Sequence, residues 1–457
     1  MNGVNQISKK ISSILHIFSL YLLICILLGG CYYRLPELKY WIGIKIESLG
    51  PYIIYGGKNA EMHLLWRFNK LSPEYKVSCT LKWGSDPDNL SKSITFTRNG
   101  NNSFYNYIFT GLTPGNRYYY KLSDIAVKKN NRDNSVLDSR GFKGSFFAAP
   151  PDTQTTLKFM VYGDTRSVIN EHKYISNLLK KTYEEEKDFQ TFVIFVGDLV
   201  RYGLYPENYW RTHFFNPAYP WLANVPIQAV PGNHEFERDI WKYQPYDYGQ
   251  TDIFRSLFPY PYQTEDRLYW SFDYGPAHFV MLDQYVKEVQ NPDVGKQHRL
   301  GSKQVAWLKE DLKRSKKRWK FLVLHEPAWT ARNEYNHDLR RVLKILDEDS
   351  VDYGIDVVLA GHAHFYARAV RNGIWHITTG GGGAKLHKLE KYLKNMDRNT
   401  AVDFAKKAYH YCKIEIDGDS LILTVIGKEE ITKADIKKQN KGEEIKGYQL
   451  DRFTIRK

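Results

Sequence analysis

The feature that most constrains the fold is a set of five apolar runs after residue 155, each of which ends in polar residues. The runs and the polar residues after them are 157–162 with Asp164 and Arg166, 191–196 with Asp198, 226–230 with Asn233 and His234, 321–324 with His325, and 357–360 with His362 and His364. Short buried strands that alternate with helical stretches are typical of a layered α/β fold. Because ligands bind at the carboxyl ends of the strands in such sheets, we expect these side chains to converge on one crevice.

The side chains at these strand ends share one kind of chemistry. Carboxylate, amide oxygen and neutral imidazole are donors suited to borderline divalent or trivalent metals, and the neighbouring glycines let the backbone turn sharply. Two aspartates, one asparagine and three histidines are too many ligands for one tetrahedral zinc ion. A pair of metal ions about 3.5–4 Å apart, bridged by one carboxylate, uses them all.

Taken singly, each motif is more often structural, because a lone histidine is usually a satisfied core or surface residue and a lone Gly-Asp is usually a turn. In this order, the five motifs resemble the calcineurin-like metallophosphoesterases. Residues 271–283, a predicted helix over 304–312 and the glycine run 380–383 extend the resemblance over about 155–430. The resemblance implies an α/β domain over 155–457, of the purple acid phosphatase type, with two mixed β-sheets flanked by helices.

The same resemblance implies a role for each residue. Asp198 would bridge the two metal ions. The other implied ligands are Asp164 and His364 for the first ion and Asn233, His325 and His362 for the second. His234 would bind phosphate or act as general acid for the leaving oxygen, and Arg166 is placed to donate two parallel hydrogen bonds to phosphate. The implied cofactors are two divalent or trivalent ions of iron, zinc or manganese.

Two positions depart from the family pattern. Related phosphoesterases often have a histidine two residues after the first aspartate, where this chain has Arg166. Purple acid phosphatases have a tyrosine three residues after the second aspartate, where this chain has Arg201. Tyr202 lies one place off, and His172 is a second candidate for the missing ligand, although a histidine on a helix surface is the simpler interpretation. Without the tyrosine, no tyrosinate-to-iron charge transfer is expected.

A region over 45–150 precedes this domain and has a different pattern. Apolar and polar residues alternate in short runs, for example over 62–66, and turn-rich pieces separate the runs, which is typical of an all-β sandwich. Residues 111–120 resemble the loop and strand of fibronectin type III domains, and 144–150 resemble a final strand. Together with Trp66, these stretches resemble the N-terminal domain of purple acid phosphatases.

The first residues have the pattern of an export signal. Lys9 and Lys10 precede an apolar run over 14–28, which is shorter than a membrane span of about 20 residues. The run ends in Leu-Gly-Gly before Cys31, a pattern that resembles the bacterial lipobox. We therefore expect a lipoprotein-type signal peptide over 1–31, acylation of Cys31, and export to the bacterial cell envelope with a lipid anchor in a membrane. An uncleaved signal anchor is the alternative.

The C-terminal part and the cysteines add two smaller expectations. An alternating pattern over 413–426 with a turn at Asp417-Gly418 predicts a hairpin, and the charged segment 428–446 predicts a loop before a last strand over 453–455. Cys79 and Cys412 fall in different predicted domains, so no structural disulfide is expected.

The charge balance bears on partners. The chain has 65 Lys and Arg against 51 Asp and Glu, and its net charge of +14 favours anionic surfaces or substrates without specifying one. The basic run 313–318 is typical of a solvated helix end, so specific nucleic-acid binding is not expected.

Two functions fit these observations. The first is a metal-dependent, acid phosphatase-like phosphoesterase that hydrolyses a phosphate ester with a hydroxide bound at the two-metal centre. The second is a membrane-anchored surface binding protein with a degenerate metallophosphoesterase domain, because the set of first-metal ligands is incomplete.

Overall fold

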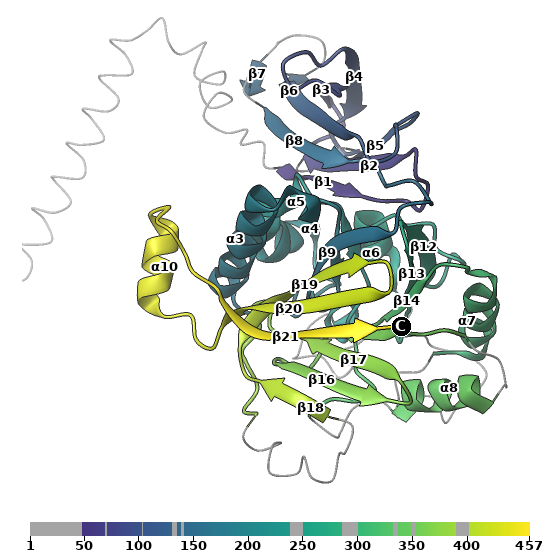
Figure 1. Ribbon diagram of the computed structural model, residues 1–457. Coiled ribbons are helices and arrows are strands. Elements are labelled where there is room, and N and C mark those ends of the chain that lie inside the picture. Colours follow the sequence, from purple (N-terminus) through teal and green to yellow (C-terminus); the bar gives the residue numbers. More distant parts are fainter. Residues whose placement is uncertain are drawn as a thin grey trace, which may run out of the picture. The chain divides into compact units, whose positions relative to one another are not determined.

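The computed structural model describes residues 48–68, 71–102, 104–129, 135–138, 141–237, 250–285, 300–331, 337–348, 353–389 and 402–457. The predicted signal peptide, with Lys9, Lys10 and Cys31, lies outside these ranges and stays a prediction. Within these ranges, no helix is both long enough and apolar enough to span a membrane. Residues 48–457 form one compact unit, with an N-terminal sandwich and a larger layered part (Figure 1).

The N-terminal part consists of two antiparallel sheets. One has the order β1-β2-β5, with β1 at Ser48–Ile54, β2 at Met62–Phe68 and β5 at Phe104–Phe109. The other has the order β4-β3-β6-β7, with β8 also paired to β6; its strands are β4 Lys92–Asn99, β3 Tyr75–Gly84, β6 Arg117–Lys129, β7 Ser135–Asp138 and β8 Phe142–Phe147. Trp66 of β2 is fully buried and its ring lies 5.4 Å from that of Phe96 in the facing sheet. The alternation of apolar and polar residues therefore corresponds to a β-sandwich. The fibronectin type III resemblance and the domain boundaries stay predictions.

The larger part contains two mixed sheets. The six-stranded sheet has the order β11-β10-β9-β19-β20-β21, with strands at Ile227–Ala229, Val193–Phe195, Thr156–Tyr162, Tyr409–Asp417, Ser420–Lys428 and Tyr448–Arg456. The seven-stranded sheet has the order β12-β13-β14-β15-β17-β16-β18, with strands at Trp270–Tyr274, Ala277–Met281, Trp319–Val323, Val357–Ala360, Ile374–Thr379, Tyr366–Arg371 and Val402–Lys406. The five runs predicted from the sequence are β9, β10, β11, β14 and β15, and within each sheet they are parallel. Their carboxyl ends therefore lie at one edge of each sheet.

Aromatic side chains fill the space between these two sheets. Phe159 of β9 lies 5.3 Å from Phe279 and 5.6 Å from Phe321 of the opposite sheet, measured between ring centroids. The next residues along those strands, Val280 and Leu322, belong to the apolar cluster on the other face. Because successive strand residues point to opposite faces, each strand contributes to both layers.

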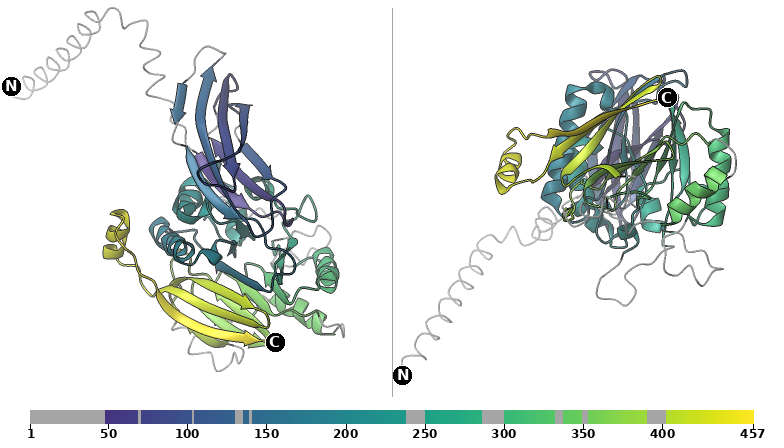
Figure 2. Two further views of the ribbon diagram at one scale, coloured as in Figure 1. Left: turned by 45° about the horizontal axis from the view of Figure 1, so that its top comes forward. Right: turned by 60° about the horizontal axis from the view of Figure 1, so that its bottom comes forward.

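Helices cover the outer faces of both sheets (Figures 1 and 2). The helices are α3 Ile169–Glu185, α4 Glu207–Trp210, α5 Asn216–Leu222, α6 Asp252–Leu257, α7 Ser302–Arg314, α8 His337–Glu348 and α10 Lys433–Asn440, with short helical turns η1 Lys187–Phe189, η2 Arg211–Phe215 and η3 Asn233–Phe236. Of these, α10 projects to one side and covers neither sheet (Figure 1). Leu308 of α7 and Val342 of α8 pack in the cluster with Val280 and Leu322. The predicted fold class, two mixed sheets flanked by helices, is thus confirmed.

The C-terminal expectations have different outcomes. The predicted hairpin is confirmed, because β19 and β20 pair antiparallel from Asp417 opposite Ser420 onward. The segment 428–446 is not simply a loop, because it contains α10. Thr432 starts this helix by accepting a hydrogen bond from the backbone of Asp435, whose carboxylate bonds back to Thr432. This capping box stabilises a helix that has little apolar surface.

Candidate metal centre

The structure brings together the six side chains for which a metal-binding role was predicted. Two groups have ligand atoms within 4.8 Å of one another: Asp198 with His325 and His362, and Asp164 with Asp198 and His364. The sixth side chain, Asn233, opens η3, and its Oδ1 lies 3.2 Å from His362 Nδ1. Asp198 belongs to both groups, so its carboxylate has the position of a bridge.

The backbone at these positions is bent into an unusual conformation. Asp164, Asp198 and His362 have positive φ angles of 58°, 57° and 62°. Non-glycine residues seldom adopt this region, and when they do they cluster at functional sites. Close packing adds a second constraint, because a Cβ on Gly232 would lie 2.3 Å from Asp198 Oδ1 and one on Gly361 would lie 2.4 Å from Asp164 Oδ2. The glycines therefore give the carboxylates room.

The group around His325 is held in a defined orientation. The Nδ1 of His325 donates a hydrogen bond to the backbone oxygen of Val196 at 2.7 Å, and the Nε2 of His325 lies 3.3 Å from Asp198 Oδ1. Burial lowers the pKa of His325, but the charge of Asp198 outweighs burial and raises it to about 10. Because a metal ligand must give up its proton, metal binding here competes with protonation.

The group around Asp164 contains a carboxylate oxygen that accepts no hydrogen bond from the residues that the structure describes. His364 Nε2 lies 3.4 Å from Asp164 Oδ1, and His364 Nδ1 lies 2.8 Å from the backbone oxygen of Lys385. Asp164 is fully buried, and its Oδ1 has no hydrogen-bond partner among the described residues. A buried, unpaired carboxylate oxygen is costly in a folded protein. A cation beside this oxygen removes that cost, so the two groups fit a pair of metal ions.

Arg166 lies beside the group that contains Asp164, Asp198 and His364. Its Nε is 3.0 Å from Asp198 Oδ2, and its Nη2 is 3.4 Å from His364 Nε2. Burial raises the pKa of Asp198, but the nearby His325, His234 and Arg166 outweigh it and hold that pKa well below the usual range. His325, His234 and Arg166 together therefore keep Asp198 ionised, and the guanidinium of Arg166 has further N–H donors besides Nε.

His234 lies at the edge of the same cluster. Its Nε2 is 4.0 Å from Asp198 Oδ2, while its Nδ1 lies 2.9 Å from the backbone oxygen of Arg201 and pairs with the Glu237 carboxylate. The Nδ1 side of the ring is thus held by acceptors. The Nε2 side faces the cluster, where a substrate oxygen would lie.

The sequence reasoning missed the structural roles of two glutamates. Glu235 is buried, and its carboxylate accepts hydrogen bonds from the backbone N–H groups of Asp198, Leu199 and Gly232 at 2.9, 2.9 and 2.6 Å. It therefore fixes the loop that carries Asp198. The available signal was its spacing three residues after Gly232, the spacing of a capping box. Glu237, which holds the ring of His234, had no such signal.

Neither candidate for the missing ligand lies in a ligand group. His172 is fully buried in α3, and its ring stacks on Phe214 while its Nε2 lies 3.2 Å from the Tyr162 hydroxyl. It is thus a core histidine rather than one on the helix surface. The ring of Tyr202 packs at 5.1 Å from Tyr205, with the Arg201 guanidinium above it.

Comparison with known proteins agrees with this geometry. Residues 157–366 match the calcineurin-like phosphoesterase family. The chain is 24% identical to purple acid phosphatase 15 of Arabidopsis thaliana over 57% of this chain and 48% of that protein. It is 26% identical to purple acid phosphatase 18 of the same plant over 72% of this chain and 70% of that protein. The chain thus spans about half the length of the first of these relatives.

The fold has a solved counterpart. The alignment with the structure of purple acid phosphatase PPD1 from yellow lupin (Lupinus luteus) covers 90% of this chain and 74% of the lupin chain, with a TM-score of 0.63 and 17% identity. The fold and the paired ligand groups define a calcineurin-like phosphoesterase domain in this chain. Its homologues include the purple acid phosphatases.

Proposed function

We propose that the protein is a metal-dependent phosphoesterase, acid phosphatase-like in its chemistry, that hydrolyses phosphate esters. The observation that carries the proposal is the sharing of Asp198 between two groups of ligands, with His234 and Arg166 at their edge. Iron, zinc and manganese all suit these oxygen and nitrogen donors. When bound, two such ions neutralise charge on a phosphoryl group and lower the pKa of water.

The chain's own side chains supply the remaining steps. Arg166 donates hydrogen bonds to the phosphate oxygens and so positions the ester. His234, held at Nδ1 by Glu237 and Arg201, presents Nε2 to the leaving oxygen and protonates it. Glu235 keeps the loop of Asp198 in place through its backbone hydrogen bonds.

The experiment that tests this function is Asp198→Asn. Because this change removes the charge shared by both groups, we expect loss of most bound metal and of nearly all turnover of p-nitrophenyl phosphate, with the circular dichroism spectrum unchanged. Metal content by mass spectrometry and turnover are measured on the same preparation. Full activity of the variant on any phosphoester would overturn the two-metal assignment.

The competing function is a surface binding protein with a degenerate site. One observation favours it, because Arg166 pairs with Asp198 where related enzymes often place a histidine ligand. The two functions differ in metal content and turnover together: the enzyme binds metal and hydrolyses the ester, whereas the binding protein does not hydrolyse it.

We also propose that the protein is exported and anchored in a bacterial membrane through lipid on Cys31. The supporting observations are Lys9, Lys10, the short apolar run and the Leu-Gly-Gly-Cys sequence. One acyl chain alone holds a protein only marginally, whereas several hold it firmly. We expect Cys31→Ser to release an active soluble enzyme or to leave an unprocessed precursor. Normal processing with retention on the membrane would contradict the anchor.

A further inference from the structure

A cavity of about 760 Å³ lies where the sandwich meets the layered part. Residues of β6, β8, α3, η1 and α5 line it. It is separate from the metal centre. Gln190, which contacts residues that line the cavity, precedes strand β10, whereas Asp198 follows the same strand. The two residues therefore lie beyond opposite ends of this strand.

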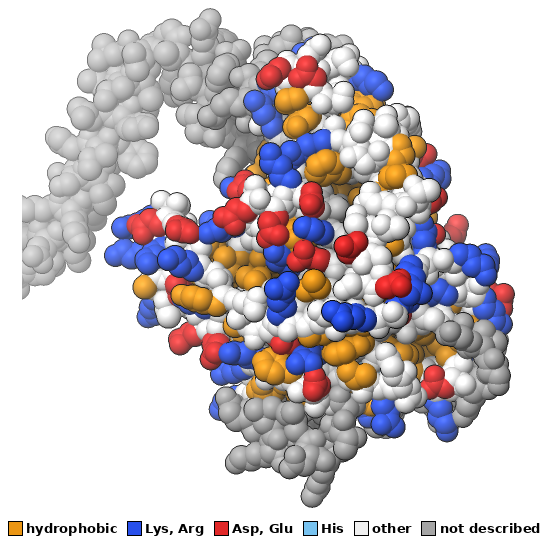
Figure 3. All heavy atoms as spheres, in the orientation of Figure 1, with side chains coloured by type: hydrophobic (Ala, Val, Ile, Leu, Met, Phe, Trp, Pro, Cys, Tyr) orange, Lys and Arg blue, Asp and Glu red, His pale blue; other side chains and the backbone are white. Residues whose placement is uncertain are grey.

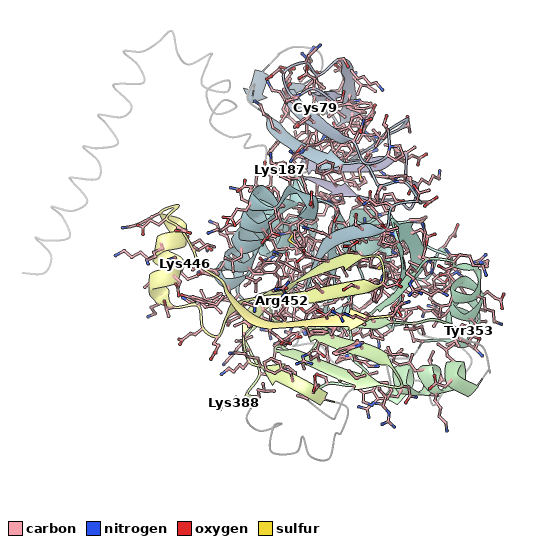
Figure 4. All side chains as sticks on the ribbon, in the orientation of Figure 1. Cys79, Lys187, Tyr353, Lys388, Lys446 and Arg452 are labelled. Carbon is pink, nitrogen blue, oxygen red and sulfur yellow. The ribbon has the colours of Figure 1, made fainter. Side chains whose placement is uncertain are left out.

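The lining of this cavity is strongly basic. Five cations line it, namely Arg117, Lys143, Lys173, Lys180 and Lys187, against the single carboxylate of Glu184. Glu184 pairs with Lys180 at 3.4 Å. Among the described residues, no carboxylate pairs with Lys143, Lys173 or Lys187, and the buried Nε of Arg117 has no hydrogen-bond partner. Figure 4 labels Lys187 where the sandwich meets α3, and Figure 3 shows both basic and acidic side chains on this face of the molecule.

The floor beneath these cations is rigid. The fully buried amide of Gln190 donates to the backbone oxygens of Ser145 and Asn224 at 2.9 and 2.8 Å, and its oxygen accepts from Arg117. The Tyr120 hydroxyl donates to the backbone oxygen of Ala223 at 2.7 Å. These bonds hold the sandwich and the layered part together, so the backbone that carries the cations is fixed before any ligand arrives, which lowers the cost of binding.

We propose that this cavity binds an anion that carries several phosphate or sulfate groups, separately from the ester at the metal centre. Unpaired cations that line one cavity repel one another, and a ligand with several negative groups relieves this repulsion at several points at once. The volume lies in the range of ligand pockets, and Asn177 and Asn216 add neutral hydrogen-bonding groups. The same chemistry belongs to a free polyanion and to a phosphorylated lipid headgroup.

The test compares two double variants with the same loss of charge. Lys173→Gln with Lys187→Gln removes cations of the cavity. Lys82→Gln with Lys316→Gln removes two exposed cations elsewhere. Calorimetric titration of the metal-loaded protein with sucrose octasulfate, which has no phosphate ester to hydrolyse, should show binding that weakens with added salt. We expect the cavity variant to bind at least tenfold more weakly, the control variant less than twofold, and both to keep their phosphatase activity.

Two further measurements sharpen the result. Asp198→Asn should keep its affinity for sucrose octasulfate, and loss of that affinity would place binding at the metal centre and overturn the proposal. Equal weakening in the two double variants, or no binding at low salt, would also overturn it. Vesicles of phosphatidylcholine with and without a bisphosphorylated inositol lipid identify the source: binding that depends on the lipid and on Lys173 and Lys187 indicates a headgroup, and binding of the soluble probe alone indicates a free polyanion.

Discussion

Asp198 contributes one carboxylate to both groups of candidate metal ligands, and its surroundings explain why the sequence pointed to it. A polar residue directly after a short buried strand has few places to lie other than the strand's carboxyl edge. The same reasoning reached Asp164, His325 and His362. It did not reach Glu235, because the spacing after Gly232 signals only the local bond to Gly232, whereas the bonds to Asp198 and Leu199 come from a second loop.

The first residue-scale prediction concerns His234. If Nε2 protonates the leaving oxygen, His234→Ala should keep the metal content and slow hydrolysis roughly 10²–10⁴-fold for an alkyl phosphate. The loss should be smallest for p-nitrophenyl phosphate, whose leaving group needs no proton. Steady-state kinetics on both esters measure the contrast. Equal losses on the two esters would mean that His234 only binds phosphate.

At the scale of elements, the strands were predictable because each is a short apolar run bounded by glycine or by polar residues. The helix α10 was not, because half of its residues are charged and only the cap at Thr432 marks its start. The position of His172 was also unpredictable, since burial of a helix face depends on which strands and helices pack against it. Here Tyr162 of β9 and Phe214 of η2 enclose the ring.

An element-scale prediction concerns the contact between the β12–β13 hairpin and α7. His278 of β13 places Nδ1 2.7 Å from Asp273 of β12 and Nε2 3.0 Å from Asp311 of α7. Burial lowers the pKa of His278, but the two carboxylates outweigh burial and raise it above its usual value. A raised folded-state pKa stabilises the fold below the unfolded pKa, and this stability is lost as the pH rises through the folded pKa.

Urea unfolding at several pH values measures this effect. The wild type should lose stability relative to His278→Gln as the pH rises above the unfolded pKa of about 6.5, and the variant should be less stable by about 2 kcal/mol at the acidic end. The difference between the two proteins should shrink as the pH rises. A difference that is the same at every pH would contradict the ion-pair account.

At the scale of the whole molecule, residues 48–457 pack as one unit that contains both the sandwich and the layered part. Alternating apolar and polar residues predicted the sandwich, and alternating strands and helices predicted the layered part. Neither pattern predicted how the two parts contact each other. That contact depends on single polar groups far apart in the chain, such as Tyr52, whose hydroxyl bonds to the backbone of Leu257, and Gln190.

This packing predicts a single unfolding transition for residues 48–457 in calorimetry of the full chain. Gln190→Ala should lower the free energy of unfolding by about 3 kcal/mol, because buried carbonyl groups and Arg117 lose their partner. It should also separate the transition into two. A wild-type protein that already shows two transitions would contradict a tightly joined unit.

The measurement that tests the central claim most directly is a metal titration of chelator-treated protein, with turnover of p-nitrophenyl phosphate followed at each step. Because five carboxylate and imidazole side chains form two groups that share Asp198, activity should return as metal is added and reach its plateau at about two ions per chain. Two bound ions with no turnover on this ester or on an alkyl phosphate, or full activity in the metal-free protein, would contradict a phosphoesterase that acts through a two-metal centre.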